Sequence, residues 1–164
     1  RVVRCRCCWN SCAPAQRSEA LVEITFYVLA ADAPLSARLT TACRLVDKAW
    51  QQNRKILLQA ANRAEAEALD ELLWAFKAEA FIPHHLVGDG PTPPPPVRIG
   101  WEALPTDSRD ILINLGADIP AGFERFQRVI EIVAGTHEER EQARGHWKEY
   151  KRLGYAVQAH ELKG

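Results

Sequence analysis

The sequence lacks an excess of charge of either sign. Its 164 residues contain 21 lysines and arginines against 21 aspartates and glutamates. A protein that coats nucleic acid or a membrane over its whole surface gains from a general basic excess. The balance therefore argues against that class of protein, and any site for an anion must be local.

Long apolar runs and paired cysteines are also missing. No apolar run approaches the roughly 18 residues of a membrane span, and none follows the N-terminal arginines as a signal peptide requires. Four of the five cysteines lie within residues 1–12, without paired CxxC spacing or a nearby histidine, so we expect neither a disulfide framework nor a zinc site. We predict a cytoplasmic protein with a disordered or non-native leader at residues 1–22 and one α/β domain at residues 23–164.

Motifs for catalysis and nucleotide binding are absent as well. The turn after the first predicted strand reads ADAPLS, without GxGxxG or GxxxxGK[ST], and no nucleophile lies in a pattern such as GxSxG. The adjacent His84 and His85 would point apart on an extended chain, which is poor geometry for one metal. We predict no catalytic residue, metal or cofactor, although a parallel sheet could still hold a phosphorylated small molecule in another way.

Alternating strand and helix patterns make up the rest of the chain. Short apolar and β-branched segments predict strands at 23–30, 55–60, 97–101, 111–115 and 129–133. Helical spacing predicts helices at 35–50, at 63–76 after an Asn62 N-cap, at 123–126 and at 137–153. This order predicts a single domain with a mostly parallel sheet and helices on both faces.

Trp74 lies off the apolar face of its predicted helix. At about 100° per residue, it points roughly 140° away from Leu69 on the core side. Either the ring lies beneath the following loop, or it anchors a partner protein, since interfaces favour tryptophan. In the second case Phe81 and Pro83 would extend the same apolar patch.

The last predicted helix places its cations on one face, with Trp147 at the edge of that face. Within about 80° of the helical wheel lie Arg140, Arg144, Lys148 and Lys151. A charged face of this kind is a solvated surface in many helices. Beside a tryptophan it also suits an anion with an apolar end, such as an acidic peptide terminus. Single-stranded nucleic acid is the alternative ligand, but one tryptophan in a protein without net charge provides little aromatic and cationic surface for such a strand.

From Ile24 to its C-terminal end, the chain resembles the chi subunit family of bacterial DNA polymerase III, an accessory part of the clamp-loader assembly. The resemblance is carried by TFYVL at 25–29, LDELLWA at 69–75, FIPHHLVGDGP at 81–91, RDILINL at 109–115 and AR..WKEYK..GY at 143–155. It implies a Rossmann-like α/β domain without a nucleotide-binding glycine loop. It also implies a non-catalytic component of the polymerase holoenzyme that acts in DNA replication in the bacterial cytoplasm, associated with the nucleoid.

The resemblance further implies two binding surfaces, through which the protein would link the clamp loader to template DNA coated by single-stranded DNA-binding protein. Its own contact with DNA would be mainly indirect. One surface would hold the psi subunit, or a helicase-like protein that competes for it, through Trp74, Phe81 and Pro83. The other would hold the acidic C-terminal tail of single-stranded DNA-binding protein through Arg140, Arg144, Trp147, Lys148, Lys151 and Val133. Trp147 stands where a relative has tyrosine, and residues 1 to about 20 have no counterpart.

Overall fold

The structure is a computed structural model that describes residues 21–77, 79, 81–88, 90–107 and 110–162. Within these residues, seven parallel strands form one sheet in the order β3-β4-β2-β5-β6-β1-β7. The strands are β1 (Glu23–Leu29), β2 (Ile56–Gln59), β3 (His84–Leu86), β4 (Val97–Gly100), β5 (Ile111–Asn114), β6 (Arg128–Val133) and β7 (Val157–Leu162).

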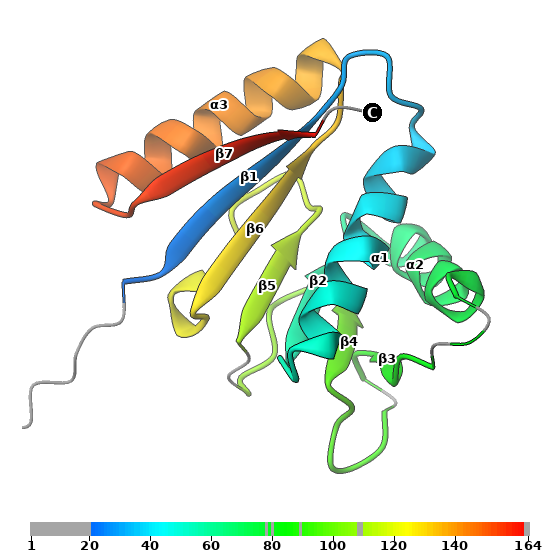
Figure 1. The fold of residues 1–164 in the computed structure, drawn as a ribbon. Helices are drawn as coiled ribbons and strands as arrows, with labels where there is room; N and C mark the ends of the chain where they lie inside the picture. Colours follow the sequence, from blue (N-terminus) through cyan, green and yellow to red (C-terminus); the bar gives the residue numbers. More distant parts are fainter. Residues whose placement is uncertain (1–20, 78, 80, 89, 108–109, 163–164) are drawn as a thin grey trace, which may run out of the picture.

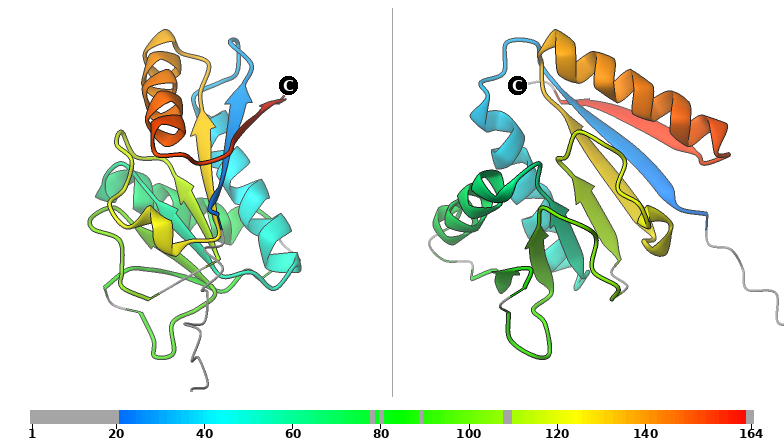
Figure 2. Two further views of the ribbon diagram at one scale, coloured as in Figure 1. Left: turned by 90° about the vertical axis from the view of Figure 1, so that its left-hand side faces the viewer. Right: turned by 180° about the vertical axis from the view of Figure 1, so that it is seen from behind.

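Helices cover both faces of this sheet (Figure 1). Helices α1 (Ser36–Gln51) and α2 (Arg63–Ala75) pack on one face, and α3 (His137–Arg152) packs on the other, together with the short 3-10 helix η1 (Phe123–Arg125). Figure 2 shows α1 and α3 on opposite sides of the strands. None of the helices in the described part of the chain has both the length and the apolar composition needed to cross a membrane.

Alternation along the strands supplies both layers of the core. On β6, Val129 and Val133 join the apolar cluster beneath α3, whereas Ile130 and Ile132 join the cluster beneath α1 and α2. This follows from the two-residue period of a strand, which turns successive side chains to opposite faces. Because both faces are covered, the strands read as nearly continuous apolar runs, which is the pattern that predicted them.

The predicted fold class is confirmed. The predicted helices and the five predicted strands begin and end within about two residues of the bounds predicted for them. The Asn62 N-cap is present, since its Oδ1 accepts a hydrogen bond from the Glu65 backbone N–H at 2.9 Å. Two strands were missed. Strand β3 has only three residues, and β7 is an edge strand whose middle residues are exposed, so neither carries a clear apolar pattern.

The predicted leader, residues 1–22, lies outside the described residues except for its last two positions. The four leader cysteines, Cys5, Cys7, Cys8 and Cys12, are therefore outside them too. Val22 is described and is buried in the cluster beneath α3, so the folded core begins at least one residue before the predicted boundary.

Candidate binding site beside helix α3

Helix α3 has defined ends and one buried edge. Thr136 is its N-cap, with a side-chain oxygen that accepts from the Glu139 backbone N–H at 3.4 Å. Gly154, at φ 89°, adopts the left-handed conformation that commonly terminates a helix. Between these ends Tyr150 is fully buried and its ring packs at right angles to Phe123, at 5.3 Å between ring centroids. These contacts hold α3 over the sheet.

A pocket of about 190 Å³ lies between α3 and strands β1, β6 and β7. We call it the α3–β7 pocket. Its lining combines apolar side chains with two cations and consists of Phe26, Val28, Val133, Arg140, Ala143, Arg144, Trp147 and Ala159. Four of the six residues predicted for an acidic tail therefore meet at one pocket: Val133, Arg140, Arg144 and Trp147.

Trp147 forms one wall of the α3–β7 pocket and is half-buried. Its ring packs against Phe26 of β1, with 5.3 Å between ring centroids. The ammonium of Lys151, a fifth predicted residue, lies 5.2 Å from the Trp147 ring centroid, within range of a cation–π interaction. The tryptophan thus lies at the border between core and cationic surface, as the helical wheel predicted.

The remaining cations differ in how far their hydrogen bonds are satisfied. Arg140 is half-buried and donates one hydrogen bond to the Leu29 carbonyl at 3.3 Å, but its buried Nε–H finds no acceptor among the described residues. Arg144 is exposed and pairs with Glu141 on the same helix. Lys148 is exposed one turn beyond Arg144 and is not among the described residues that line the pocket. Its predicted part in tail binding stays a prediction.

Sequence reasoning missed the part of the pocket that comes from strands. Phe26 and Val28 share one face of β1, which their two-residue spacing already indicated, but nothing local shows which helix covers that face. Ala159 belongs to β7, a strand that was not predicted. It comes to the site only because β7 pairs with β1, with Phe26 opposite Ala159.

A second candidate surface lies on the other face of the molecule, at α2 and the segment before β3. Trp74 and Phe81 are 57% and 67% exposed, with 5.4 Å between their ring centroids. The interpretation that Trp74 lies beneath the following loop is therefore wrong. Pro83 is half-buried next to them, and buried His84 packs 4.8 Å from Trp74 while its Nδ1 lies 2.7 Å from the Ile82 carbonyl. We call Trp74, Phe81 and Pro83 the Trp74 patch.

Comparison with known proteins identifies the family. The family described as DNA polymerase III chi subunit, HolC, matches residues 21–158. The chain belongs to this family. The DNA polymerase III subunit chi of Pseudomonas aeruginosa is 39% identical over 142 residues, which is 87% of this chain and 98% of the relative. The Escherichia coli subunit chi is 34% identical over 135 residues, or 80% and 92% of the two chains.

A solved structure resembles this chi-family fold at low sequence identity. The crystal structure of a DEAD box protein from the hyperthermophile Methanococcus jannaschii aligns with a TM-score of 0.53 and 14% identity. The alignment covers 88% of this chain and 43% of that one. At this identity the likeness concerns the fold alone, and it agrees with a parallel α/β sheet.

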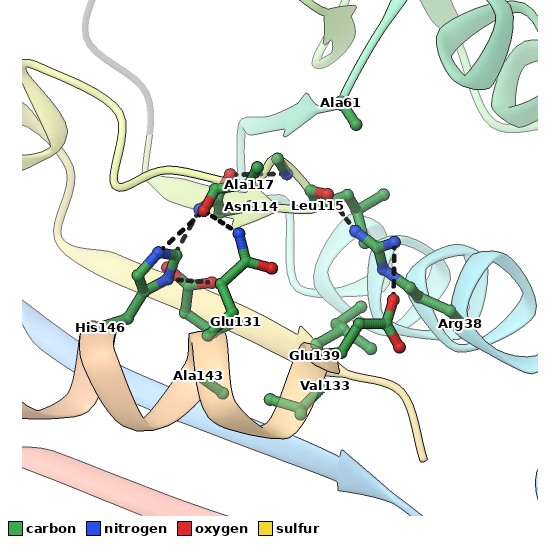
Figure 3. A pocket seen from close by; sticks show the side chains of 13 residues that line it. Arg38, Ala61, Asn114, Leu115, Ala117, Glu131, Val133, Glu139, Ala143 and His146 are labelled. Carbon is green, nitrogen blue, oxygen red and sulfur yellow. Dashed lines mark hydrogen bonds and ion pairs between the residues drawn. The ribbon is translucent and has the colours of Figure 1, made fainter. Parts of the chain in front are cut away.

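The opposite flank of α3 in this chi-family chain is fixed by a buried polar network (Figure 3). The Glu131 carboxylate on β6 accepts from the Tyr150 hydroxyl at 2.9 Å and from the Asn114 side-chain amide at 3.1 Å. The two ring nitrogens of His146 lie 3.5 Å from Glu131 Oε2 and 3.1 Å from the Ala117 carbonyl oxygen. Because both nitrogens face acceptors, the protonated ring fits best, and the hydrogen bond to Glu131 raises the pKa of His146. Burial, with the Glu131 charge as a second cause, raises the pKa of Tyr150.

Arg38 of α1 joins the beginnings of the other two helices. Its Nη1 lies 3.6 Å from Glu65 of α2 and 3.3 Å from Glu139 of α3, as Figure 3 shows for the second pair, and its Nη2 donates to the Leu115 carbonyl. Glu65 also accepts from the Ala61 backbone N–H at 2.6 Å. The N-termini of α2 and α3, where a phosphate would bind in a parallel α/β fold, thus already hold carboxylates of the chain. This arrangement disfavours the phosphorylated-ligand alternative.

Proposed function

We propose that this chi-family chain is a non-catalytic accessory subunit of the DNA polymerase III holoenzyme that bridges two partners during DNA replication in the bacterial cytoplasm. One partner is the psi subunit, through which the chain would join the clamp-loader complex. The other is the acidic C-terminal tail of single-stranded DNA-binding protein. Family membership supports the role in DNA polymerase III, and the two surfaces described above support the two partners.

The α3–β7 pocket is the observation that carries the proposal. A chain end brings a carboxylate and an apolar side chain together, and the pocket places Arg140 and Arg144 beside an apolar wall closed by Trp147. The guanidinium groups of these two arginines carry the N–H donors that such a carboxylate would accept from. Lys151 on the Trp147 ring adds positive charge for the acidic residues that precede the chain end.

The Trp74 patch supports the second half of the proposal. Exposed aromatic side chains in contact with each other are typical of protein–protein anchors, and Trp74 and Phe81 meet that description. The patch belongs to α2 and the chain before β3, whereas the tail pocket belongs to α3 and to the far end of the sheet (Figure 2). Psi, or a helicase-like protein at the same patch, could therefore bind without displacing the tail.

A direct single-strand binder is the less favoured function. Bases need several aromatic platforms along a cationic groove, and the α3–β7 pocket offers one tryptophan in about 190 Å³. The neutral total charge of the chain also gives little attraction to a phosphate backbone. We infer that contact with DNA is mainly indirect, through the tail of the protein that coats it.

Calorimetric titration with two peptides of the same acidic sequence tests the tail site. The peptide with a free C-terminal carboxylate should bind more tightly than its amidated form by about 1.5 to 3 kcal/mol, the range of a hydrogen bond to a charged group. The affinity should fall with added salt, because exposed charges are screened. Equal affinity for the two peptides, or retention of the protein on a bare oligonucleotide at moderate salt, would contradict the proposal.

A further inference from the structure

Strand β7 forms an edge of the sheet whose outer side is open. In the described part of the chain it pairs with β1 alone, and its residues Gln158 to Glu161 are exposed. Figures 1 and 2 place it at the rim of the sheet, with α3 over one face. An open edge presents a row of backbone N–H and C=O groups and is a template for pairing with another chain.

The register with β1 determines which backbone groups of β7 face outward. Ile24 pairs with Val157, and its N–H donates to the Ala156 carbonyl at 3.3 Å. In a parallel ladder, alternate residues turn both their N–H and their C=O to the same neighbouring strand. Gln158 and His160 therefore bond to β1. The residues whose backbone groups face outward are Val157, Ala159 and Glu161.

The α3–β7 pocket reaches this edge at Ala159. This alanine is exposed, and it supplies the part of the described lining that comes from β7. It pairs with Phe26 of β1, another residue of the lining. A strand added to the sheet would lie about 4.8 Å beyond β7. Because the side chain of alanine ends at Cβ, a side chain of that strand can pass over it into the pocket.

Helix α3 runs beside β7 in the opposite direction. The chain turns at Gly154, directly after α3, and enters β7 three residues later. Arg140, in the first turn of α3, donates to the Leu29 carbonyl, and Leu29 pairs with Leu162 at the end of β7. The beginning of the helix thus lies near the end of the strand.

The cations of α3 therefore give the edge a polarity. Arg140 and Arg144 line the pocket toward the end of β7, whereas Lys151, on the Trp147 ring, lies toward the beginning of the strand. A chain end held by the two arginines, with its acidic residues directed toward Lys151, would run in the same direction as β7. The charge distribution thus favours an acidic peptide in an extended, parallel orientation.

We propose that the acidic tail pairs with β7 as an additional parallel strand, with its last side chain in the α3–β7 pocket. Its backbone would exchange hydrogen bonds with Val157, Ala159 and Glu161. This inference rests on the proposed tail site and adds to it how the peptide backbone is held. Main-chain pairing would supply affinity, and the pocket and the cations would supply the preference for an acidic chain end.

Amide hydrogen exchange followed by NMR on the full chain tests the added strand. The probe is the peptide Asp-Asp-Asp-Val-Ala-Leu with a free carboxylate. Without peptide, the amides of Gln158 and His160 should exchange slowly and those of Ala159 and Glu161 rapidly. Saturating peptide should slow exchange at Ala159 and Glu161 by about tenfold or more, because their outward N–H groups become hydrogen-bonded.

Peptides with one methylated backbone nitrogen supply a matched pair for calorimetry. In an added strand, neighbouring peptide residues turn their N–H groups to opposite sides, so only one of two adjacent positions faces β7. Methylation at the valine and methylation at the alanine of the probe should therefore differ. One of them should weaken binding by about three- to tenfold, as expected for one lost hydrogen bond, and the other should bind like the unmodified peptide.

The outcomes separate this inference from the tail site on which it rests. Failure of the unmodified peptide to bind would overturn both. Binding that leaves exchange rapid at Ala159 and Glu161, or that is equally affected by the two methylations, would overturn the added strand alone. Slow exchange at these amides without peptide, together with a dimer in sedimentation, would assign the edge to a second copy of the chain and overturn the proposal. Equal affinity for Ser-Ser-Ser-Val-Ala-Leu would overturn the role of the cations.

Discussion

The two flanks of α3 differ in how far their polar groups are satisfied. On the β5 side, the buried Glu131 carboxylate has three partners, Tyr150, Asn114 and His146, and the network holds the helix in place. On the β7 side, Arg140 keeps a buried donor without a described acceptor and lines an apolar pocket. The satisfied network holds α3 in place, whereas the apolar pocket with its two arginines is the surface that we propose a partner covers.

The largest effect is expected from breaking the closed flank. Tyr150→Ala removes a fully buried aromatic ring and one hydrogen bond to Glu131, and should lower the free energy of unfolding by about 3 to 5 kcal/mol. Tyr150→Phe removes only the hydroxyl and should cost about 1 to 3 kcal/mol. Urea denaturation measures both. If Tyr150→Phe cost as much as Tyr150→Ala, packing against Phe26 and Phe123 would not be what the ring contributes.

The next effect extends the comparison to the Trp74 patch. Trp74→Ala should weaken binding to psi by about 2 to 4 kcal/mol, the range for an aromatic anchor at the centre of an interface, while tail affinity stays unchanged. Co-purification and calorimetry with each partner measure the two affinities. A matched control is Leu35→Ala, which removes another exposed apolar side chain, just before α1 and outside the patch. Undiminished binding of psi by the Trp74 variant would remove the patch from the proposed function.

A smaller effect sharpens the assignment of the open flank. Arg144→Ala should reduce tail affinity by about 1 to 3 kcal/mol, because it removes a charge-assisted hydrogen bond to the peptide. Arg152→Ala is the matched control, since Arg152 is also an exposed arginine of α3 paired with a glutamate three residues earlier, but it is not among the described residues lining the pocket. Equal losses in the two variants would indicate general electrostatic attraction instead of a built site.

The smallest effect concerns pH and tests the closed flank again. The folded state raises the pKa of His146 above its ordinary value of 6.5, chiefly through the hydrogen bond to Glu131 and despite the opposing effect of burial. The resulting stabilisation is fully present below that ordinary value and is lost as the pH rises through the higher folded pKa. Unfolding free energy measured from pH 5.5 to 8.5 should therefore decline for the original chain and decline less for His146→Gln. Parallel curves would show that His146 is not the group responsible.

Local patterns sufficed to predict the elements and one face of the site. The Asn62 cap and the position of Trp147 at the edge of the cationic face both depend on residues within one or two helical turns of each other. The family resemblance added Val133 to this set, and the structure places it in the same pocket. Whether that pocket holds the acidic tail is a question for the titrations above.

Only the tertiary structure decided how the pocket closes and which cations reach it. Phe26 and Ala159 meet because β1 and β7, which lie more than one hundred residues apart in the sequence, pair in parallel. Lys148 is not among the described residues that line the pocket, although it shares a helical face with Arg144. The ion pairs of Arg38 with Glu65 and Glu139 likewise join three helices. Spacing along a chain determines which side chains share a face, because helix and strand periods are local. Which faces then meet depends on strand order and burial summed over the whole fold, and no single segment contains that information.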